Sequence, residues 1–202
     1  MKTILAFLFL AGSMASASQQ ASIVAAKGNT QILTLTPSTP SSARVKFEDK
    51  VYYVQKARIG AKLKGQDIVH TGPDGQLKAI YPSGELIFVG PGSAFAMPTV
   101  ADQGSTTKGG TANLIYGKIR SLVTKQGSLK HFEVKTPAAV AGVRGTDFFV
   151  GYNGITGSTV TVLRGEVEVK TTSTANVAKS EPQVATVKPG FTAAVPVAPK
   201  TE

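Results

Sequence analysis

The chain has 202 residues, and 42% of them are hydrophobic, which is enough for one domain with a substantial core. Its 21 glycines, 11 prolines and lack of tryptophan indicate a turn-rich all-β protein and argue against a helical bundle. The absence of cysteine excludes disulfides, thiolate metal sites and cysteine nucleophiles. With only two histidines, His70 and His131, a histidine-rich metal site is not expected.

The formal net charge is +10, and the lysines are scattered along the chain. Many of them alternate with apolar residues, as in Ala61-Lys62-Leu63-Lys64, a pattern typical of strands with one solvated face. We therefore favour solvation and protection of exposed strand edges as the role of these lysines. The alternative is a weak attraction for an anionic cell-wall polymer or for an acidic partner.

The first residues, MKTILAFLFLAGSMASAS, carry one lysine, Lys2, followed by an apolar stretch over residues 4–11 and by small residues. Ala15-Ser16-Ala17 matches the A-x-A rule of signal peptidase, so we predict a signal peptide over residues 1–17 with cleavage after Ala17. An uncleaved membrane anchor is disfavoured because a transmembrane helix needs about 20 apolar residues. We expect a periplasmic protein with no membrane span in the mature chain. Secretion or attachment to the cell surface stays open, and export argues against a nucleic-acid partner.

Strand-like segments follow at residues 23–26 and 31–36, and then comes a Pro/Ser/Thr-rich stretch, TPSTPSSA. We assign residues 18–43 to N-terminal strands and a linker or exposed loop. One β domain is predicted over residues 44–197, and residues 198–202 are predicted to form a flexible tail.

Turn signals punctuate the first part of this domain. Gly72-Pro73-Asp74-Gly75, Pro82-Ser83-Gly84 and Gly90-Pro91-Gly92 combine the fixed φ of proline with glycines that tolerate a positive φ. The segments between these turns have roughly five to eight residues, which is the strand length and spacing of a sandwich, barrel or solenoid. Residues 100–111 are polar and glycine-rich, which predicts a mobile surface loop.

Strands are predicted to resume in the second half, with a short helix near Leu114 or Ser121 as an alternative. The predicted strands cover residues 119–124, 131–134, 141–150, 159–163, 166–171, 184–187 and 191–195. In VTVLRGEVEV a single glycine, Gly165, separates two of these strands, which indicates a tight bend rather than a hairpin loop. Strands that turn corners in this way can stack in layers. We therefore predict an all-β domain of the layered β-solenoid-like or rolled β-sandwich type.

Five sequence features occur in an order that is similar to a known family. They are Leu63–Asp67 with Thr71–Gly75, Tyr81–Glu85 with Gly90–Ser93, Gly117–Leu122, Thr136–Phe148, and Val160–Val169 closed by Pro189-Gly190. The most specific of them is TPAAVAGVRGTDF, which follows the pattern T-P-x-x-V-x-x-V-R-G-T-D-F. Over roughly residues 56–195 the chain resembles the FecR domain family, periplasmic β-rich domains named for a ferric-citrate signalling regulator.

The resemblance implies an all-β periplasmic fold. Family members that regulate transcription carry a cytoplasmic anti-sigma region and one membrane helix ahead of this domain, and we expect a signal peptide in their place here. We predict a non-enzymatic, exported FecR-like domain that acts as a protein-interaction or sensing module in the cell envelope, with a link to signalling left open. Its expected partner is an envelope protein or an anionic cell-wall polymer, and no cofactor or metal is expected. The alternatives are a structural or envelope-polysaccharide-binding surface protein and an unrecognised hydrolase.

The motif contains the candidate site residues Arg144, Gly145, Thr146, Asp147 and Phe148, and it places two opposite charges in an apolar segment. A separation of three residues puts these charges on opposite faces of a flat strand, but Gly145 lets the chain turn a corner. In a structural arrangement, Asp147 accepts backbone or arginine donors, and Arg144 meets carbonyls or another carboxylate. In a functional arrangement, Arg144 faces a cleft and binds an anion or a partner's carboxylate. We favour the structural arrangement, a corner that locks the strand register, because unpaired charges are costly among apolar residues.

A catalytic role has little support in the sequence. Ser121, Ser128 and His131 lie near one another and Asp147 completes a triad on paper, yet no nucleophile elbow surrounds either serine. We therefore predict that the protein is not an enzyme. The carboxylates that alternate with apolar strand residues are expected on solvated faces, namely Glu85, Glu133, Glu166 and Glu168.

Overall fold

Only strands and turns occur in the part of the chain that the computed structural model describes, residues 20–36, 43–100, 109–127, 129, 131–172 and 183–197. The all-β prediction is therefore confirmed. Several predicted features lie outside these residues: the signal peptide, most of the Pro/Ser/Thr-rich stretch, the centre of the predicted surface loop and the C-terminal tail. Within the described segments, no helix is long and apolar enough to cross a membrane.

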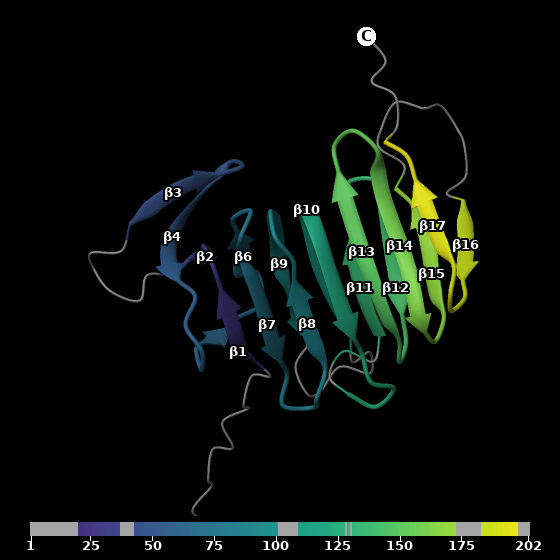
Figure 1. The fold of residues 1–202 in the computed structure, drawn as a ribbon, viewed down its shortest axis with the longest axis horizontal. Helices are drawn as coiled ribbons and strands as arrows, with labels where there is room; N and C mark the ends of the chain where they lie inside the picture. The colour runs from purple at the N-terminus through teal and green to yellow at the C-terminus, as the bar shows by residue number, and fades with distance from the viewer. Residues whose placement is uncertain are drawn as a thin grey trace, which may run out of the picture.

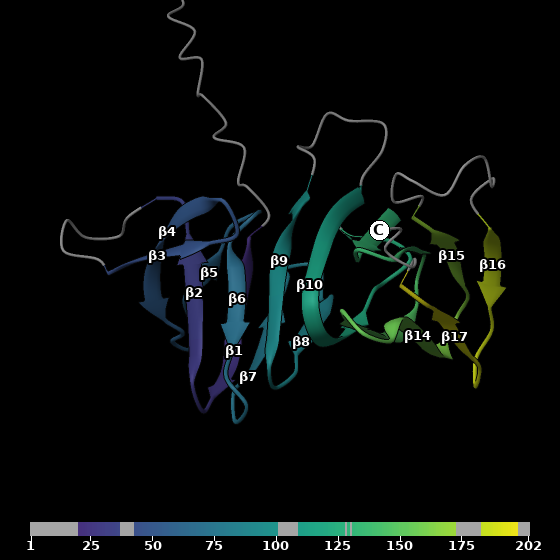
Figure 2. The ribbon, with the colours of Figure 1, turned by 90° about the horizontal axis from the view of Figure 1, so that it is seen from above.

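Seventeen strands join in one continuous hydrogen-bonded sheet that folds over itself into two layers, which we call sheet A and sheet B (Figures 1 and 2). Sheet A contains, in spatial order, β5 (Lys62–Leu63), β1 (Ala21–Lys27), β7 (Gln76–Ile80), β8 (Leu86–Val89), the second half of β10 (Gly109–Leu122), β13 (Asp147–Asn153), β14 (Gly157–Arg164) and β17 (Thr192–Val195).

Sheet B contains, in spatial order, β3 (Arg44–Phe47), β4 (Lys50–Lys56), β2 (Thr30–Thr34), β6 (Ile68–Thr71), β9 (Ser93–Val100), the first half of β10, β11 (His131–Lys135), β12 (Ala139–Val143), β15 (Val167–Thr171) and β16 (Val184–Val187). Neighbouring strands are antiparallel except β10 and β11, which are parallel. The predicted N-terminal strands are part of the same two layers, since β1 pairs in sheet A and β2 in sheet B.

Strand β10 is the link between the two layers. Its first half pairs with β9 and β11 in sheet B, and its second half pairs with β8 and β13 in sheet A. The change falls at Gly117, which has a φ of 96° and packs so closely that a Cβ would lie 2.2 Å from Oγ of Ser93. The alternative of a short helix near Leu114 or Ser121 was wrong, because both residues lie in β10 with buried side chains at every second position.

Two further corners connect the layers. The predicted strand over residues 141–150 is in fact two strands, β12 in sheet B and β13 in sheet A, separated at residues 144–146. The bend predicted at Gly165 is confirmed: β14 lies in sheet A, β15 lies in sheet B, and each pairs with other strands. A Cβ at Gly165 would come within 2.8 Å of Thr146, so the two corners pack against each other.

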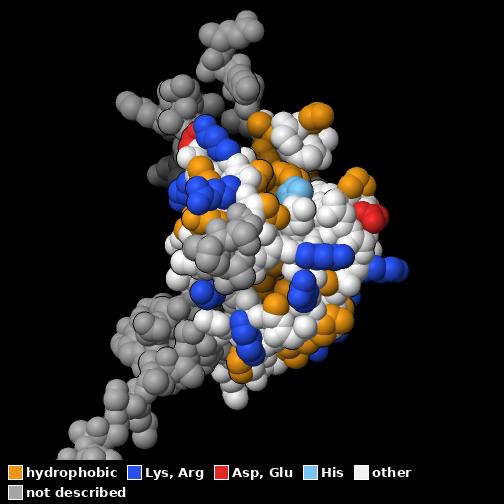
Figure 3. All heavy atoms as spheres, turned by 90° about the vertical axis from the view of Figure 1, so that its left-hand side faces the viewer, with side chains coloured by type: hydrophobic (Ala, Val, Ile, Leu, Met, Phe, Trp, Pro, Cys, Tyr) orange, Lys and Arg blue, Asp and Glu red, His pale blue; other side chains and the backbone are white. Residues whose placement is uncertain are grey.

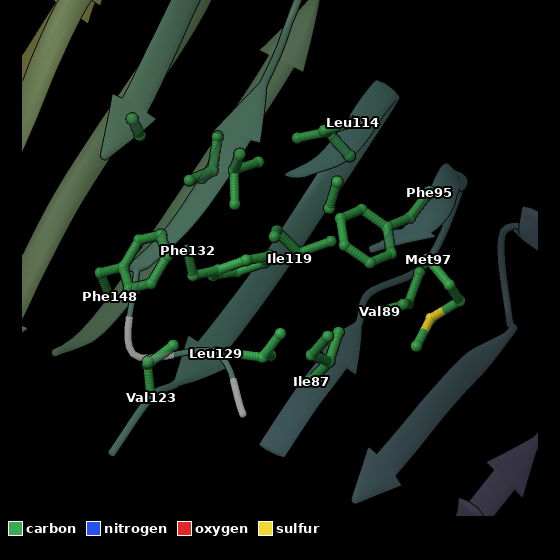
Figure 4. Close-up of a cluster of buried hydrophobic side chains, with 14 of the residues drawn as sticks. Ile87, Val89, Phe95, Met97, Leu114, Ile119, Val123, Leu129, Phe132 and Phe148 are labelled. Atoms are coloured by element: carbon green, nitrogen blue, oxygen red, sulfur yellow. The ribbon is translucent and has the colours of Figure 1, made fainter. Parts of the chain in front are cut away.

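The main core fills the space between the two sheets. Side chains from alternate strand positions of both layers form one buried cluster. Figure 4 shows Phe95, Leu114 and Phe132 of sheet B pointing into the same interior as Ile119 and Phe148 of sheet A. Phe95, Phe132 and Phe148 are among the largest fully buried side chains, so these rings supply much of the apolar area removed from water.

A smaller cluster lies on the outer face of sheet B, beneath the hairpin formed by β3 and β4. Its buried members are Leu33, Tyr52, Ile68 and Ala94. The ring of His70 packs edge-on against those of Phe47 and Tyr116, with centroid distances of 6.4 Å in both pairs. The hairpin is therefore held over one end of this face by apolar and aromatic contacts, and the rest of the face stays uncovered by the described strands.

Candidate functional site

The family motif forms the corner between β12 and β13. Gly145 has a φ of 68°, and a Cβ there would lie 2.2 Å from Cγ of Lys125, so the corner leaves room for glycine alone. Thr146 and Phe148 are fully buried, and Phe148 belongs to the main core. Arg144, at the start of the same corner, is exposed.

Asp147 is tied into the structure by an arginine other than Arg144. Nε and Nη2 of Arg120 donate to Oδ1 and Oδ2 of Asp147 at 2.9 and 2.8 Å, a two-pronged ion pair between β10 and β13. The hydrogen bond to Asp147 raises the pKa of Arg120, burial opposes this effect, and the charge of Asp147 adds a smaller increase. Asp147 thus has the arginine partner of the structural arrangement. Arg144 has no hydrogen-bond or ion-pair partner among the described residues and takes the exposed position of the functional arrangement.

Cations and aromatic rings alternate across the outer face of sheet A. Nζ of Lys78 lies 4.9 Å from the ring centre of Phe88. The guanidinium of Arg120 lies 5.9 Å from that same ring centre and 5.3 Å from the ring centre of Phe149. These side chains come from paired positions on adjacent strands, so the charges of this face contact neighbours within the protein.

The expectation that Glu85 lies on a solvated face was wrong, because this carboxylate is fully buried. Oε1 accepts the backbone N–H of Leu129 at 3.1 Å and the hydroxyl of Thr124 at 3.3 Å, and Oε2 accepts the hydroxyl of Ser83. The side chain occupies the space beside Gly127, where a Cβ would come within 1.5 Å of Oε1. The carboxylate therefore anchors the connection between β10 and β11.

The burial of Glu85 also affects its neighbour Tyr81. Burial, and secondarily the charge of Glu85, raise the pKa of the Tyr81 hydroxyl above its usual range. The other three carboxylates expected on solvated faces, Glu133, Glu166 and Glu168, are exposed as predicted.

A groove of about 1470 Å³ runs across the outer face of sheet B. Its lining comes from seven neighbouring strands, namely β6, β9, β10, β11, β12, β15 and β16, and from the β3–β4 hairpin at one end. The hairpin end is apolar, with Tyr52, Ile68 and Ile115 in the lining. The groove thus begins over the smaller apolar cluster and continues onto the uncovered part of the sheet.

Away from the hairpin, the groove carries charged side chains of both signs. Strand register places Glu133 opposite Gly142, and Gly142 opposite Glu168, so two carboxylates flank a position that has no side chain. A Cβ at Gly142 would meet only the backbone oxygen of Glu168, at 3.8 Å, so the floor is open there. His131 and Arg144 line the same groove and are exposed.

The serine, histidine and aspartate residues considered as a catalytic triad do not lie together in the structure. Ser121 is fully buried on the core side of sheet A, whereas His131 is exposed in the groove on the outer face of sheet B. Ser128 lies outside the described residues. Among the residues with assigned positions, no three His, Asp or Glu side chains group in a way that could hold a metal ion.

The sequence interpretation missed two features, the Arg120–Asp147 pair and the groove. Arg120 was part of a quoted family feature, and its alternation with Ile119 and Ser121 could have placed it on the outer face. The groove had no such signal, because its lining comes from strands that are far apart in the sequence.

Residues 67–168, about half of the chain, match the FecR protein family. The chain belongs to the FecR family. The matched region of this FecR-family protein starts just before β6 and ends within β15, so it contains the three crossings between the layers and the central strands of the groove. It does not contain β1 to β5.

Two crystal structures of a candidate anti-sigma factor from Parabacteroides distasonis, at 1.65 and 2.50 Å resolution, are similar to this chain. Each has 20% sequence identity and a TM-score of 0.48, and the similarity covers 62% of this chain. The chain spans about half the length of those proteins, 52%. No match was found among the curated proteins.

Proposed function

We propose that this FecR-family protein is an exported, non-enzymatic interaction or sensing module of the cell envelope, and that its groove binds a segment of a partner protein. The observation that carries the proposal is the groove itself. It combines an apolar end, an open floor at Gly142 and two charged side chains, Glu133 and Arg144, that form no ion pair among the described residues. Concave surfaces with an apolar part and a few polar groups are the usual form of binding sites.

The dimensions of the groove suit an extended peptide. Seven neighbouring strands at roughly 4.8 Å spacing span about 30 Å, and an extended chain advances about 3.3 Å per residue. The groove could therefore hold roughly nine residues of a partner, with an apolar side chain at the hairpin end. Each contact would be made against a rigid sheet, which lowers the entropy lost on binding.

The distribution of charge favours a polypeptide over an anionic polymer as the occupant. Arg144 would attract anionic groups, but Glu133 lies beside the open floor and would repel them, and Glu168 is already paired with Lys170 at 2.7 Å. A peptide that carries both signs of charge can complement both sets. A polysaccharide-binding or structural role is the competing proposal, and it predicts no dependence on the shape of this floor.

The location of the protein outside the cytoplasm is also part of the proposal. The N-terminal charge, apolar stretch and A-x-A sequence support export through a cleaved signal peptide. N-terminal sequencing of the protein recovered from a periplasmic extract tests this directly, with Ser18 as the expected first residue. Recovery of the intact leader in the cytosol would contradict export.

Site-directed photocrosslinking in cells tests the use of the groove. A photoreactive amino acid at Glu133 is expected to capture one partner protein, whereas the same amino acid at Thr159, exposed on β14 in sheet A, should not. Gly142→Tyr would fill the open floor and is expected to abolish the crosslink at Glu133. Equal capture from both positions, or capture that persists in Gly142→Tyr, would exclude the groove as the binding site.

A matched pair of variants separates blocking from misfolding. Gly142→Ala adds a Cβ in ordinary contact with its surroundings and should keep the crosslink, and both variants should keep a melting temperature close to that of the wild type. A hydrolase, by contrast, would show substrate turnover that is lost in His131→Ala.

A further inference from the structure

The end of the sandwich formed by β3, β4 and β5 is strongly basic. Residues 44–64 contain seven exposed cations and only two acids, Glu48 and Asp49, which occupy the turn of the hairpin. The seven cations are Arg44, Lys46, Lys50, Lys56, Arg58, Lys62 and Lys64. Figure 3 looks onto this end of the molecule and shows many Lys and Arg side chains around apolar surface, with few Asp or Glu. The seven cations belong to strands at one end of the two sheets and to their connections, and we call the surface that they present the basic end.

Apolar side chains project among these cations. Ile59 is 71% exposed and follows Arg58 in the connection between β4 and β5. Val51 is 57% exposed and pairs in register with Lys46, so the two side chains share one side of the hairpin. The guanidinium of Arg44 lies 5.3 Å from the ring centre of Tyr53 on that same side. This end of the molecule therefore presents apolar as well as cationic side chains to its surroundings.

We propose that the basic end docks onto an anionic phospholipid surface. A bilayer offers negative headgroups to the cations and an apolar interior to side chains such as Ile59 and Val51. A soluble anionic polymer would engage the cations and leave the apolar side chains in water. Five of the seven cations are lysines, flexible point charges that suit the diffuse charge of a lipid surface better than the fixed geometry of a single carboxylate.

This surface is separate from the groove proposed for the partner protein, except at the hairpin turn, where Glu48 and Lys50 line the groove as well. It also precedes Asp67, the first residue matched to the FecR family. Docking through the basic end would leave most of the groove, on the outer face of sheet B, free to receive a partner. The two proposals therefore fail or hold independently.

Vesicle sedimentation tests the proposal, with the chain from residue 18 onward, which contains every described residue. We expect binding to vesicles of phosphatidylglycerol mixed with phosphatidylcholine, weakening as salt is added, and no measurable binding to phosphatidylcholine alone. Each lysine or arginine near an anionic bilayer raises the affinity about fivefold, so Lys46→Gln with Arg58→Gln should weaken binding roughly 25-fold. The control pair Lys118→Gln with Lys188→Gln, exposed on other parts of the surface, should bind as the wild type does.

The apolar variant distinguishes a lipid surface from a soluble polyanion. Ile59→Ser is expected to weaken vesicle binding severalfold and to leave binding to dextran sulfate unchanged, whereas Ile155→Ser, at a more exposed turn, should change neither. If Ile59→Ser binds vesicles as tightly as the wild type, the basic end serves a polymer or mere solvation, and the proposal is wrong. Equal losses in the two charge-removal pairs would also overturn it.

Discussion

The two outer faces of the sandwich use their charged side chains in different ways. On sheet A, Lys78 and Arg120 contact aromatic rings, and Asp147 is bound by Arg120 through two hydrogen bonds. On sheet B, Arg144 and Glu133 line an open groove and make no ion pair with any residue that the structure describes. Charges of the first kind contribute to folding, whereas charges of the second kind remain available to a ligand.

The contrast is sharpest within the family motif itself. Arg144 and Asp147 are three residues apart, yet the corner at Gly145 sends one to the groove and ties the other to sheet A. A substitution on sheet A, or at a buried charge behind it, is therefore expected to lower stability. A substitution in the groove is expected to leave stability almost unchanged and to affect binding.

The largest expected effect is that of Glu85→Ala. The buried carboxylate accepts three hydrogen bonds, and its removal leaves the N–H of Leu129 unpaired and opens a cavity beside Gly127. We expect a loss of about 3 kcal/mol or more in the free energy of unfolding, measured by urea denaturation. A loss below about 1 kcal/mol would show that the connection between β10 and β11 holds without this anchor.

Asp147→Asn is expected to have an intermediate effect. The Arg120 guanidinium would lose its charged partner, but its side chain is 38% exposed, so water compensates part of the loss. We expect about 1–3 kcal/mol of destabilisation, less than for a fully buried pair. Glu133→Gln makes the same chemical change on the groove face and should cost less than about 0.5 kcal/mol. Equal costs for the two variants would remove the distinction between the faces.

Alkaline pH is expected to lower the stability of the protein through the buried hydroxyl of Tyr81. The raised pKa of Tyr81 means that the folded state favours the neutral hydroxyl. Its contribution to stability is complete below the ordinary pKa of 10.0 and is lost as the pH rises through the folded pKa. The loss should reach about 1 kcal/mol within the first pH unit above 10.0. Stability measured against pH should fall less steeply in Tyr81→Phe than in the wild type. The more exposed Tyr116, on the groove side, provides the control, because Tyr116→Phe should flatten the curve less.

The smallest effect on stability is expected for Arg144→Gln. The side chain is exposed and has no hydrogen-bond partner among the residues with assigned positions, so the free energy of unfolding should change by less than about 0.5 kcal/mol. Arg120→Gln is the matched change on sheet A and should cost more, because it leaves Asp147 without its arginine. The same Arg144→Gln protein should lose affinity for the partner captured at Glu133. If the Arg144→Gln protein is as stable as the wild type and the partner is still captured at Glu133, then Arg144 contributes neither to folding nor to binding.

Several features of the fold were predictable because they depend on neighbouring residues. Alternation of apolar and polar side chains predicted most strands, and Gly165 between two such runs predicted the corner between β14 and β15. The pattern around Gly145 was harder to interpret, because ten mostly apolar residues resemble one buried strand. The corner at residues 144–146 separates that run into two strands.

Other features depend on contacts between distant residues. Asp147 pairs with a residue 27 positions away, and Glu85 reaches a backbone N–H 44 positions away. The sequence around Glu85 predicts a solvated turn carboxylate. In the structure its side chain is buried because it occupies the space beside Gly127. The crossing of β10 between the sheets likewise becomes visible only when both sets of partner strands are in place.

The sequence by itself determined the all-β class, the corner at Gly165 and the membership in the FecR family. These follow from composition, from period-two alternation and from a local motif, all of which act over a few residues. Only the tertiary structure decided which charges pair, which carboxylate is buried, and that strands far apart in the sequence form one groove. Charge pairing and surface shape depend on distances in space, and residues far apart in the chain become neighbours only when the two sheets close over their core.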